Sequence, residues 1–132
     1  MDKKIKHLEM LQGVISRMAG NSFLIKGWSI TLVSAFVALA VSNGNKLLIA
    51  AAFFPTIMFW FLDAYFLRQE RLFRKLYDYA RALDESKIDF SMNTSQFNNV
   101  VSPWLGVTAS RTLLIFYGTM LIAVLITLFV LA

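Results

Sequence analysis

The stretch from Leu47 to Leu83 constrains the fold more than any other part of the sequence. Its first 21 residues, LLIAAAFFPTIMFWFLDAYFL (47–67), are almost entirely apolar, and about 20 such residues suffice to cross a hydrocarbon core. The following RQERLFRKLYDYARAL (68–83) is too charged for lipid, yet its apolar residues recur at helical spacing. Because no Gly or Pro stands at the junction, we predict one helix that spans the bilayer and leaves it as a basic amphipathic rod.

The composition supports an all-α integral membrane protein. The chain has 132 residues, of which 58% are hydrophobic, and three long apolar runs are more than a soluble domain of this size can hide. It has no cysteine, which excludes disulfides and thiolate chemistry, and a single histidine, His7, which we expect to be solvated among lysines. Phosphate-loop, serine-hydrolase and zinc-protease motifs are missing. We therefore predict that the protein is not an enzyme and has no cofactor or metal.

Residues 1–22 are predicted to form an N-terminal cytosolic amphipathic helix. Gly20 and Asn21 are expected to interrupt it, and Ser22 is a plausible N-cap for the next helix. This first helix either lies on the membrane surface or packs its apolar face against the rod or another copy of the chain. Small residues that permit close approach favour packing. The apolar face contains Ile5, Leu8, Leu11, Ile15 and Met18.

The rest of the chain divides into three parts. Residues 23–67 are predicted to form a transmembrane hairpin, with spans at about 23–41 and 47–67 joined by the turn sequence Ser42-Asn43-Gly44-Asn45. Residues 68–102 form the cytosolic basic helix and, from 87 onward, a polar loop. Pro103 suits the first position of a helix, so residues 103–132 are predicted as one third transmembrane helix about 45 Å long.

The distribution of basic residues predicts the orientation in the membrane. Twelve of the 13 Lys and Arg residues precede the first span or lie between the second and third, whereas Lys46 alone lies in the opposite loop. Positive residues accumulate in cytoplasmic loops. We therefore expect a bacterial inner-membrane protein with a cytosolic N-terminus and a periplasmic C-terminus.

Asp63 is the one acidic residue inside a predicted span. Carboxylates are costly in lipid and usually face a partner or a water-filled cavity. One interpretation is a pore-lining or gating residue; the other is a structural ion pair with Lys26 or Arg111, which reach a similar depth from the other spans. The position of Asp63 near the cytosolic end of its span favours the ion pair.

Few polar residues are available to line a pore. Pro55 removes a helical hydrogen bond in mid-span and is either a gate hinge or a tolerated proline. One copy has too few helices to enclose a water path, so a channel requires a homo-oligomer in the lipid bilayer, and its gate can be a hydrophobic constriction. The pore or gating candidates are Asp63, Pro55, Thr31, Ser34 and Thr56.

The rod carries a basic face that is suited to phosphates. It either binds a nucleotide, an oligonucleotide or anionic lipid, or serves as a topology signal whose charges pair with acids on the same helix. Glu70 and Arg74 have the spacing for such a pair. The candidate ligand residues are Arg68, Arg71, Arg74, Lys75 and Arg81.

Two strings, RMAGNSFLIKGW (17–28) and FWFLDAYFLRQERLFRKLYD (59–78), resemble small bacterial membrane effectors of anti-phage defence. The chain is similar to SLATT-type effectors and to the Hailong membrane effector over roughly its first 85 residues. The resemblance implies an oligomeric channel that is closed in healthy cells and is controlled by a nucleotide or oligonucleotide from a nucleotidyltransferase partner. Opening would depolarise the inner membrane. The alternative is a non-conducting scaffold that recruits a cytosolic partner.

Overall fold

A computed structural model describes residues 2–131, and within them the chain is helical without strands. The elements are α1 (Asp2–Asn43), α2 (Lys46–Arg81), η1 (Glu85–Lys87), η2 (Ser95–Phe97), α3 (Trp104–Thr108) and α4 (Arg111–Leu131). Helices α1, α2 and α4 are each long and apolar enough to cross a membrane. The prediction of an all-α chain with three helices long and apolar enough to span a membrane is thus confirmed.

Helix α2 is the uninterrupted rod predicted from its sequence. It has 36 residues, so it extends for about 54 Å, well beyond the ~30 Å of a hydrocarbon core. Pro55 is buried inside it, and the helix continues past the proline without a break.

Helix α1 corrects the prediction of two separate helices. It runs for 42 residues without interruption at Gly20 or Asn21. A glycine costs about 1 kcal/mol in a helix interior, and residues on both sides of Gly20, Ile15 and Ile25, are buried in the bundle. Ser22 consequently does not act as an N-cap, and its hydroxyl bonds to Asp63 on α2 instead.

The turn between α1 and α2 forms a tight antiparallel hairpin, as predicted, but it is shorter than the predicted Ser42–Asn45. Ser42 and Asn43 belong to α1, so only Gly44 and Asn45 connect the helices. Gly44 has φ of +63°, a left-handed conformation that favours glycine. The amide of Asn45 donates to the carbonyl of Ala40 at 3.1 Å. The side chain of Asn45 then caps α2 by accepting from the amide of Leu47 at 2.9 Å.

The third predicted helix, over 103–132, is in fact two helices. Helix α3 ends at Thr108, and α4 begins at Arg111. The indole of Trp60 donates to the carbonyl of Thr108 at 2.9 Å, so this helix-terminal acceptor is satisfied by α2 rather than by a continuing helix. The 21 residues of α4 give about 32 Å, close to one hydrocarbon thickness.

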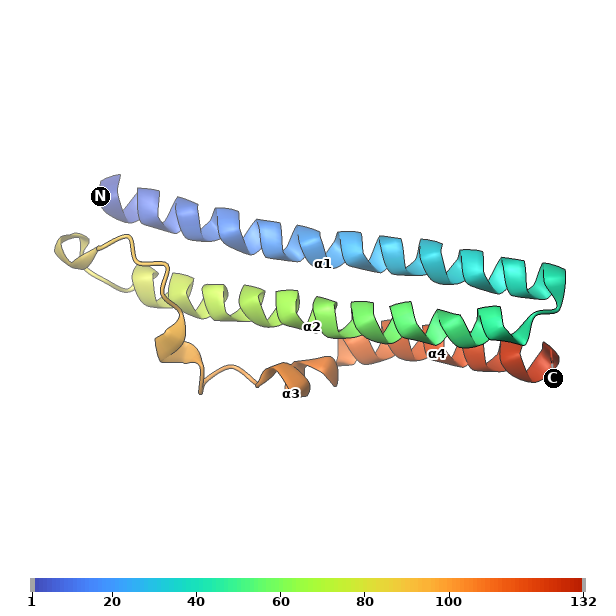
Figure 1. Cartoon of the computed structure of the whole chain (residues 1–132). Coiled ribbons are helices and arrows are strands. Elements are labelled where there is room, and N and C mark those ends of the chain that lie inside the picture. Colours follow the sequence, from blue (N-terminus) through green and yellow to red (C-terminus); the bar gives the residue numbers. More distant parts are fainter. Residues whose placement is uncertain (1, 132) are drawn as a thin grey trace.

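The three long helices lie side by side, and α4 covers only the half of α2 nearest the hairpin (Figure 1). We call the other end the head: residues 2–20 of α1, 68–81 of α2 and the connecting segment 82–103. There Leu11 of α1 is fully buried in one cluster with Leu76 and Ala80 of α2. Of the two predicted placements of the N-terminal amphipathic face, packing against the rod is therefore the one observed.

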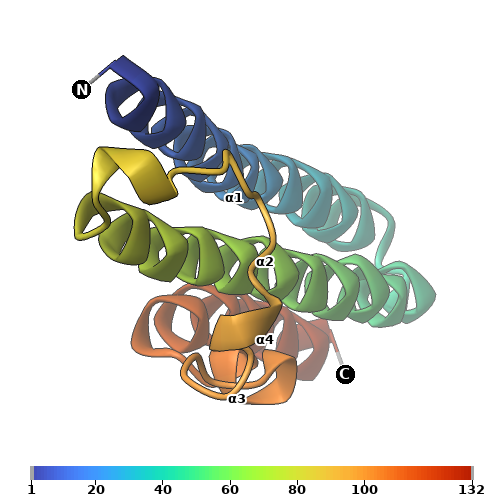
Figure 2. The ribbon, with the colours of Figure 1, turned by 90° about the vertical axis from the view of Figure 1, so that its left-hand side faces the viewer.

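The connecting segment crosses the head (Figure 2). It bonds to α1 and, through Arg68 and Ser102, to α2. The carboxylate of Glu85 accepts from the amides of Lys3 and Lys4, at 2.8 and 3.3 Å. His7 lies 2.9 Å from the carbonyl of Ser91 through Nε2, which must carry the proton because a carbonyl only accepts. His7 is 2% exposed, so the expectation of a solvated histidine was wrong.

Candidate functional site

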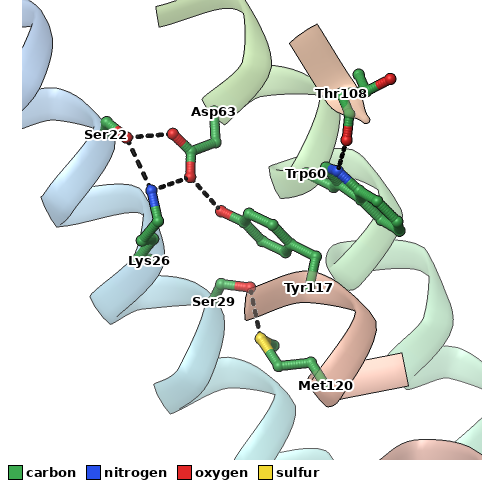
Figure 3. A network of polar contacts seen from close by, with 8 residues as sticks. All are labelled: Ser22, Lys26, Ser29, Trp60, Asp63, Thr108, Tyr117 and Met120. Atoms are coloured by element: carbon green, nitrogen blue, oxygen red, sulfur yellow. Dashed lines mark hydrogen bonds and ion pairs between the residues drawn. The ribbon is translucent and has the colours of Figure 1, made fainter. Parts of the chain in front are cut away.

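The site with the densest polar contacts surrounds Asp63, where the three long helices meet (Figure 3). The Asp63 side chain is 0% exposed. Its Oδ2 lies 2.6 Å from Nζ of Lys26 on α1 and accepts from the hydroxyl of Tyr117 on α4 at 2.9 Å. Its Oδ1 accepts from the hydroxyl of Ser22 on α1. We call these four residues the Asp63 network.

The network lies inside the apolar part of the bundle, close to the head: Asp63 is five residues before Arg68, about 7.5 Å along α2. Tyr117 is six residues beyond Arg111, the first residue of α4, and is therefore about 9 Å along the helix axis. Of the two ion-pair partners predicted for Asp63, Lys26 is the one observed. Arg111 does not pair with Asp63 in the described part of the chain, because it starts α4 more than a turn away.

The network neutralises a buried carboxylate with three donors. A charge in an apolar interior is stable only when it is paired and hydrogen-bonded. The ammonium of Lys26 also donates to the hydroxyl of Ser22 at 2.9 Å and lies 5.9 Å from the centre of the Phe116 ring. The Lys26 side chain remains 21% exposed, whereas that of Asp63 is 0% exposed. The carboxylate is thus the member that depends most on its partners.

Sequence reasoning missed Tyr117 and assigned Ser22 to a different role. The Tyr117 ring is stacked on Trp60, with centroids 5.8 Å apart and an interplanar angle of 10°, which fixes its hydroxyl toward Asp63. A usable signal was that Tyr117 is the one phenol in the third apolar run. For Ser22, the signal was its position one helical turn before Lys26.

The other pore candidates do not gather around Asp63. Thr31 and Ser34 are exposed on α1, and the Thr31 hydroxyl donates to the carbonyl of Gly27 in its own helix. Thr56 is buried and donates to Ala52 in the same way. Pro55 borders an apolar groove of about 500 Å³ between α1 and α2. Within one chain, these residues do not line a shared polar path.

The predicted basic face is partly assembled into a groove. Arg71, Arg74 and Lys75 line one wall, and residues 100–102 of the connecting segment line the other, around about 400 Å³. We call this the basic groove; Asp78 also borders it. The guanidinium of Arg68 donates to the carbonyl of Ser102 at 3.2 Å and joins the two walls.

Two of the predicted basic residues pair with acids on their own helix. Arg74 lies 3.5 Å from Glu70, and Arg81 lies 3.7 Å from Asp78. The Arg81–Asp78 pair is exposed on both sides, whereas the Glu70 side chain is 16% exposed. Surface pairs of this type contribute little stability. Within residues 2–131, Arg71 and Lys75 form no ion pair, so the basic groove has positive charge that is not matched by the protein.

Comparison with known protein families, curated proteins and solved structures finds no match for this chain. Among the described residues, no cluster of histidine and carboxylate side chains has the arrangement of a metal site. The two polar features that α2 carries are the buried ion pair of Asp63 and the basic groove.

Proposed function

We propose that this protein is the subunit of a homo-oligomeric, ligand-controlled pore in the bacterial inner membrane. The observation that carries the proposal is that one unbroken helix, α2, bears both the basic groove and Asp63. Arg71 is eight residues from Asp63, or about 12 Å along the axis. A ligand that moves the head end of α2 therefore acts directly on the buried ion pair.

The opposite wall of the groove leads to the other half of the network. Residues 100–102 precede α3, whose first residue, Trp104, donates its indole N–H to the carbonyl of Phe61 at 3.0 Å. Helix α4 follows with Tyr117. An anion held between Arg71 and Ser102 thus bridges α2, which supplies Asp63, and the segment that leads into α4, which supplies Tyr117. Binding and release would change the relative position of α2 and α4.

In this mechanism the Asp63 network is a latch. With the carboxylate bonded to Lys26, Ser22 and Tyr117, the three helices are held together and polar groups face inward. Separating the partners exposes an ammonium and a carboxylate within the span, and such groups attract water. In a ring of subunits, wetting at this level opens a path for ions through a constriction that is otherwise apolar.

The ligand we propose is a nucleotide or oligonucleotide made by a nucleotidyltransferase partner. Guanidinium and ammonium groups bind phosphate oxygens well. The groove is lined by three such groups, of which Arg74 is paired with Glu70, while Arg71 and Lys75 form no ion pair within residues 2–131. Together with the resemblance to anti-phage effectors, this charge supports a role in which the pore depolarises the membrane during infection. The N-terminus and the head would then lie in the cytosol, as the basic residues predict.

The second candidate function is a non-conducting scaffold whose head recruits a soluble partner. It is favoured by the hydroxyls of Thr31, Thr56, Thr119 and Thr127, each of which donates to a carbonyl in its own helix. Such hydroxyls do not form a hydrophilic lining. A scaffold would bind its partner without conducting ions.

Ion flux separates the two functions. The purified protein is reconstituted in liposomes at known oligomeric mass, and flux is recorded with and without cyclic nucleotides and short nucleic acids. The proposal predicts that one such ligand changes the ion flux of the native protein. In the R71E/R74E variant, the same ligand should no longer change it. The matched control reverses two exposed basic residues outside the groove, as K6E/R17E, and should respond like the native chain. A defined oligomer that is silent with every ligand would refute the pore and favour the scaffold.

A further inference from the structure

The head contains a second pocket, separate from the basic groove. It lies where the connecting segment covers α1 and α2 and encloses about 360 Å³, within the range of small-molecule sites. We call it the polar pocket. Its floor includes Leu76 of α2 and Leu83 of the connecting segment. Its polar lining includes His7, Tyr79, Lys87, Asp89, Asn93 and Gln96.

The polar wall of this pocket is preformed by local hydrogen bonds. The carboxylate of Asp89 accepts from the amide of Ser91 at 3.0 Å, and the Ser91 hydroxyl accepts from the amide of Asn93 at 3.2 Å. The amide oxygen of Asn93 then accepts from the amide of Ser95 at 3.0 Å. Three successive side-chain-to-backbone turns of this kind define the path of the backbone from Asp89 to Ser95. The bond from His7 to the Ser91 carbonyl ties the wall to α1.

The chemistry of the lining suits an uncharged, planar, hydrogen-bonding ligand. Lys87 and Asp89 balance in charge, so the pocket does not select an anion. Asn93 uses its amide oxygen on the backbone and keeps its NH₂ as a donor, while Gln96 offers a donor and an acceptor. The Tyr79 ring is 47% exposed and is supported edge-on by Phe97. Amide groups beside an aromatic face are how proteins bind nucleobases.

The polar pocket and the basic groove are adjacent along α2. Arg71, Lys75 and Tyr79 are four residues apart and therefore form one row on the helix surface. Arg71 and Lys75 line the groove, whereas Tyr79 lines the pocket. From Lys75 to Tyr79 is about 6 Å along the axis. The connecting segment provides the facing wall of both, with Gln96 at the pocket and Ser102 at the groove.

We infer that the polar pocket binds the nucleoside part of a nucleotide whose phosphate lies over Lys75 and Arg71 in the basic groove. This inference rests on the proposed function, which assigns the phosphate of the ligand to the basic groove. It adds a site for the nucleobase, which the charge of the groove does not specify. The base lies against Tyr79, and its edge is read by Asn93 and Gln96. One ligand then contacts both α2 and the second half of the connecting segment.

Binding of nucleosides without phosphate tests the pocket by itself. The full chain in lipid nanodiscs is titrated by calorimetry with the four nucleoside 5′-monophosphates, the same nucleosides, and inorganic phosphate. We expect at least one nucleoside to bind saturably and its monophosphate to bind more tightly. Q96A should weaken that nucleoside by about fivefold, through one lost hydrogen bond. Y79L, which keeps an apolar contact to Phe97, should weaken it by about tenfold or more. N99A, an exposed site on the same segment, is the matched control and should have no effect.

The outcomes separate this inference from the proposed function. The pocket is refuted if no nucleoside binds, or if Q96A and Y79L bind as the native chain does, even when nucleotides still control flux through Arg71 and Arg74. If nucleosides bind in a manner that depends on Gln96 while ion flux is absent under every condition, nucleoside binding in the polar pocket is supported and the pore is refuted.

Discussion

The asymmetry of the buried ion pair gives the sharpest prediction. Asp63 is 0% exposed, whereas the Lys26 side chain is 21% exposed, so the two partners are not equally expendable. Removing one member of a buried pair costs about 3–5 kcal/mol in general. K26M leaves a fully buried carboxylate with two hydroxyl donors, and we expect a loss of about 3 kcal/mol. D63N leaves an ammonium on a flexible stem that can turn toward the headgroups, and we expect about 2 kcal/mol.

The double variant K26M/D63N measures the coupling between them. If the pair acts as a unit, the double variant loses about 3 kcal/mol rather than the roughly 5 kcal/mol of the summed single losses. The free energy of unfolding is obtained by titrating SDS into mild detergent and following the fluorescence of the three tryptophans. K46M, which removes an exposed lysine at the start of α2, is the control for losing one positive charge. Additive single losses, within about 0.5 kcal/mol, would refute the coupled pair.

The same variants distinguish a latch from a purely structural pair. If the Asp63 network holds the pore shut, D63N should raise the basal leak of liposomes or change the response to ligand. A variant that is less stable in detergent but leaks no more than the native protein would show that the pair supports the fold without controlling ions. K46M again provides the reference.

Three further predictions follow from single contacts. G44A places a side chain at a φ of +63° and should cost about 1 kcal/mol of unfolding free energy, with G20A, in a helix with open space around it, as the control; no loss for G44A would contradict the left-handed turn. E85Q weakens the acceptor at the start of α1, so amide exchange there should accelerate; unchanged rates would argue against this cap. Y117F removes one donor to Asp63 and should cost about 1.5–3 kcal/mol in the SDS titration; full stability would exclude this bond.

The extent of α2 could be predicted from sequence because the pattern is local. Apolar residues at helical spacing continue from the span into the charged stretch, and nothing at the junction breaks a helix. The hairpin turn followed similarly from the residue types at Gly44 and Asn45. For Asp63, the sequence left two ion-pair partners open, Lys26 and Arg111. The choice between them depends on how α1 and α4 are placed along α2, which the local sequence pattern does not specify.

The failures came from long-range contacts that override local preference. Gly20 does not break α1, because both flanking turns pack against α2. The apolar run after Pro103 gave no sign of a break, but a bond from Trp60, 48 residues away, marks where α3 ends. His7 is buried and is hydrogen-bonded to the carbonyl of Ser91, 84 positions later. Each of these depends on how the connecting segment folds back over the bundle.

The short turn at Gly44 limits where a partner can bind to the protein. On that side of the bundle, α1 and α2 are joined by only Gly44 and Asn45, which leaves almost no surface for a partner to grip. The head, by contrast, presents both pockets and most of the charge. We therefore expect partners and ligands of this hairpin to bind at the head rather than at the turn. A bulky label inserted at Gly44 should therefore leave the binding of partners and ligands unchanged, whereas the same label in the connecting segment should weaken it.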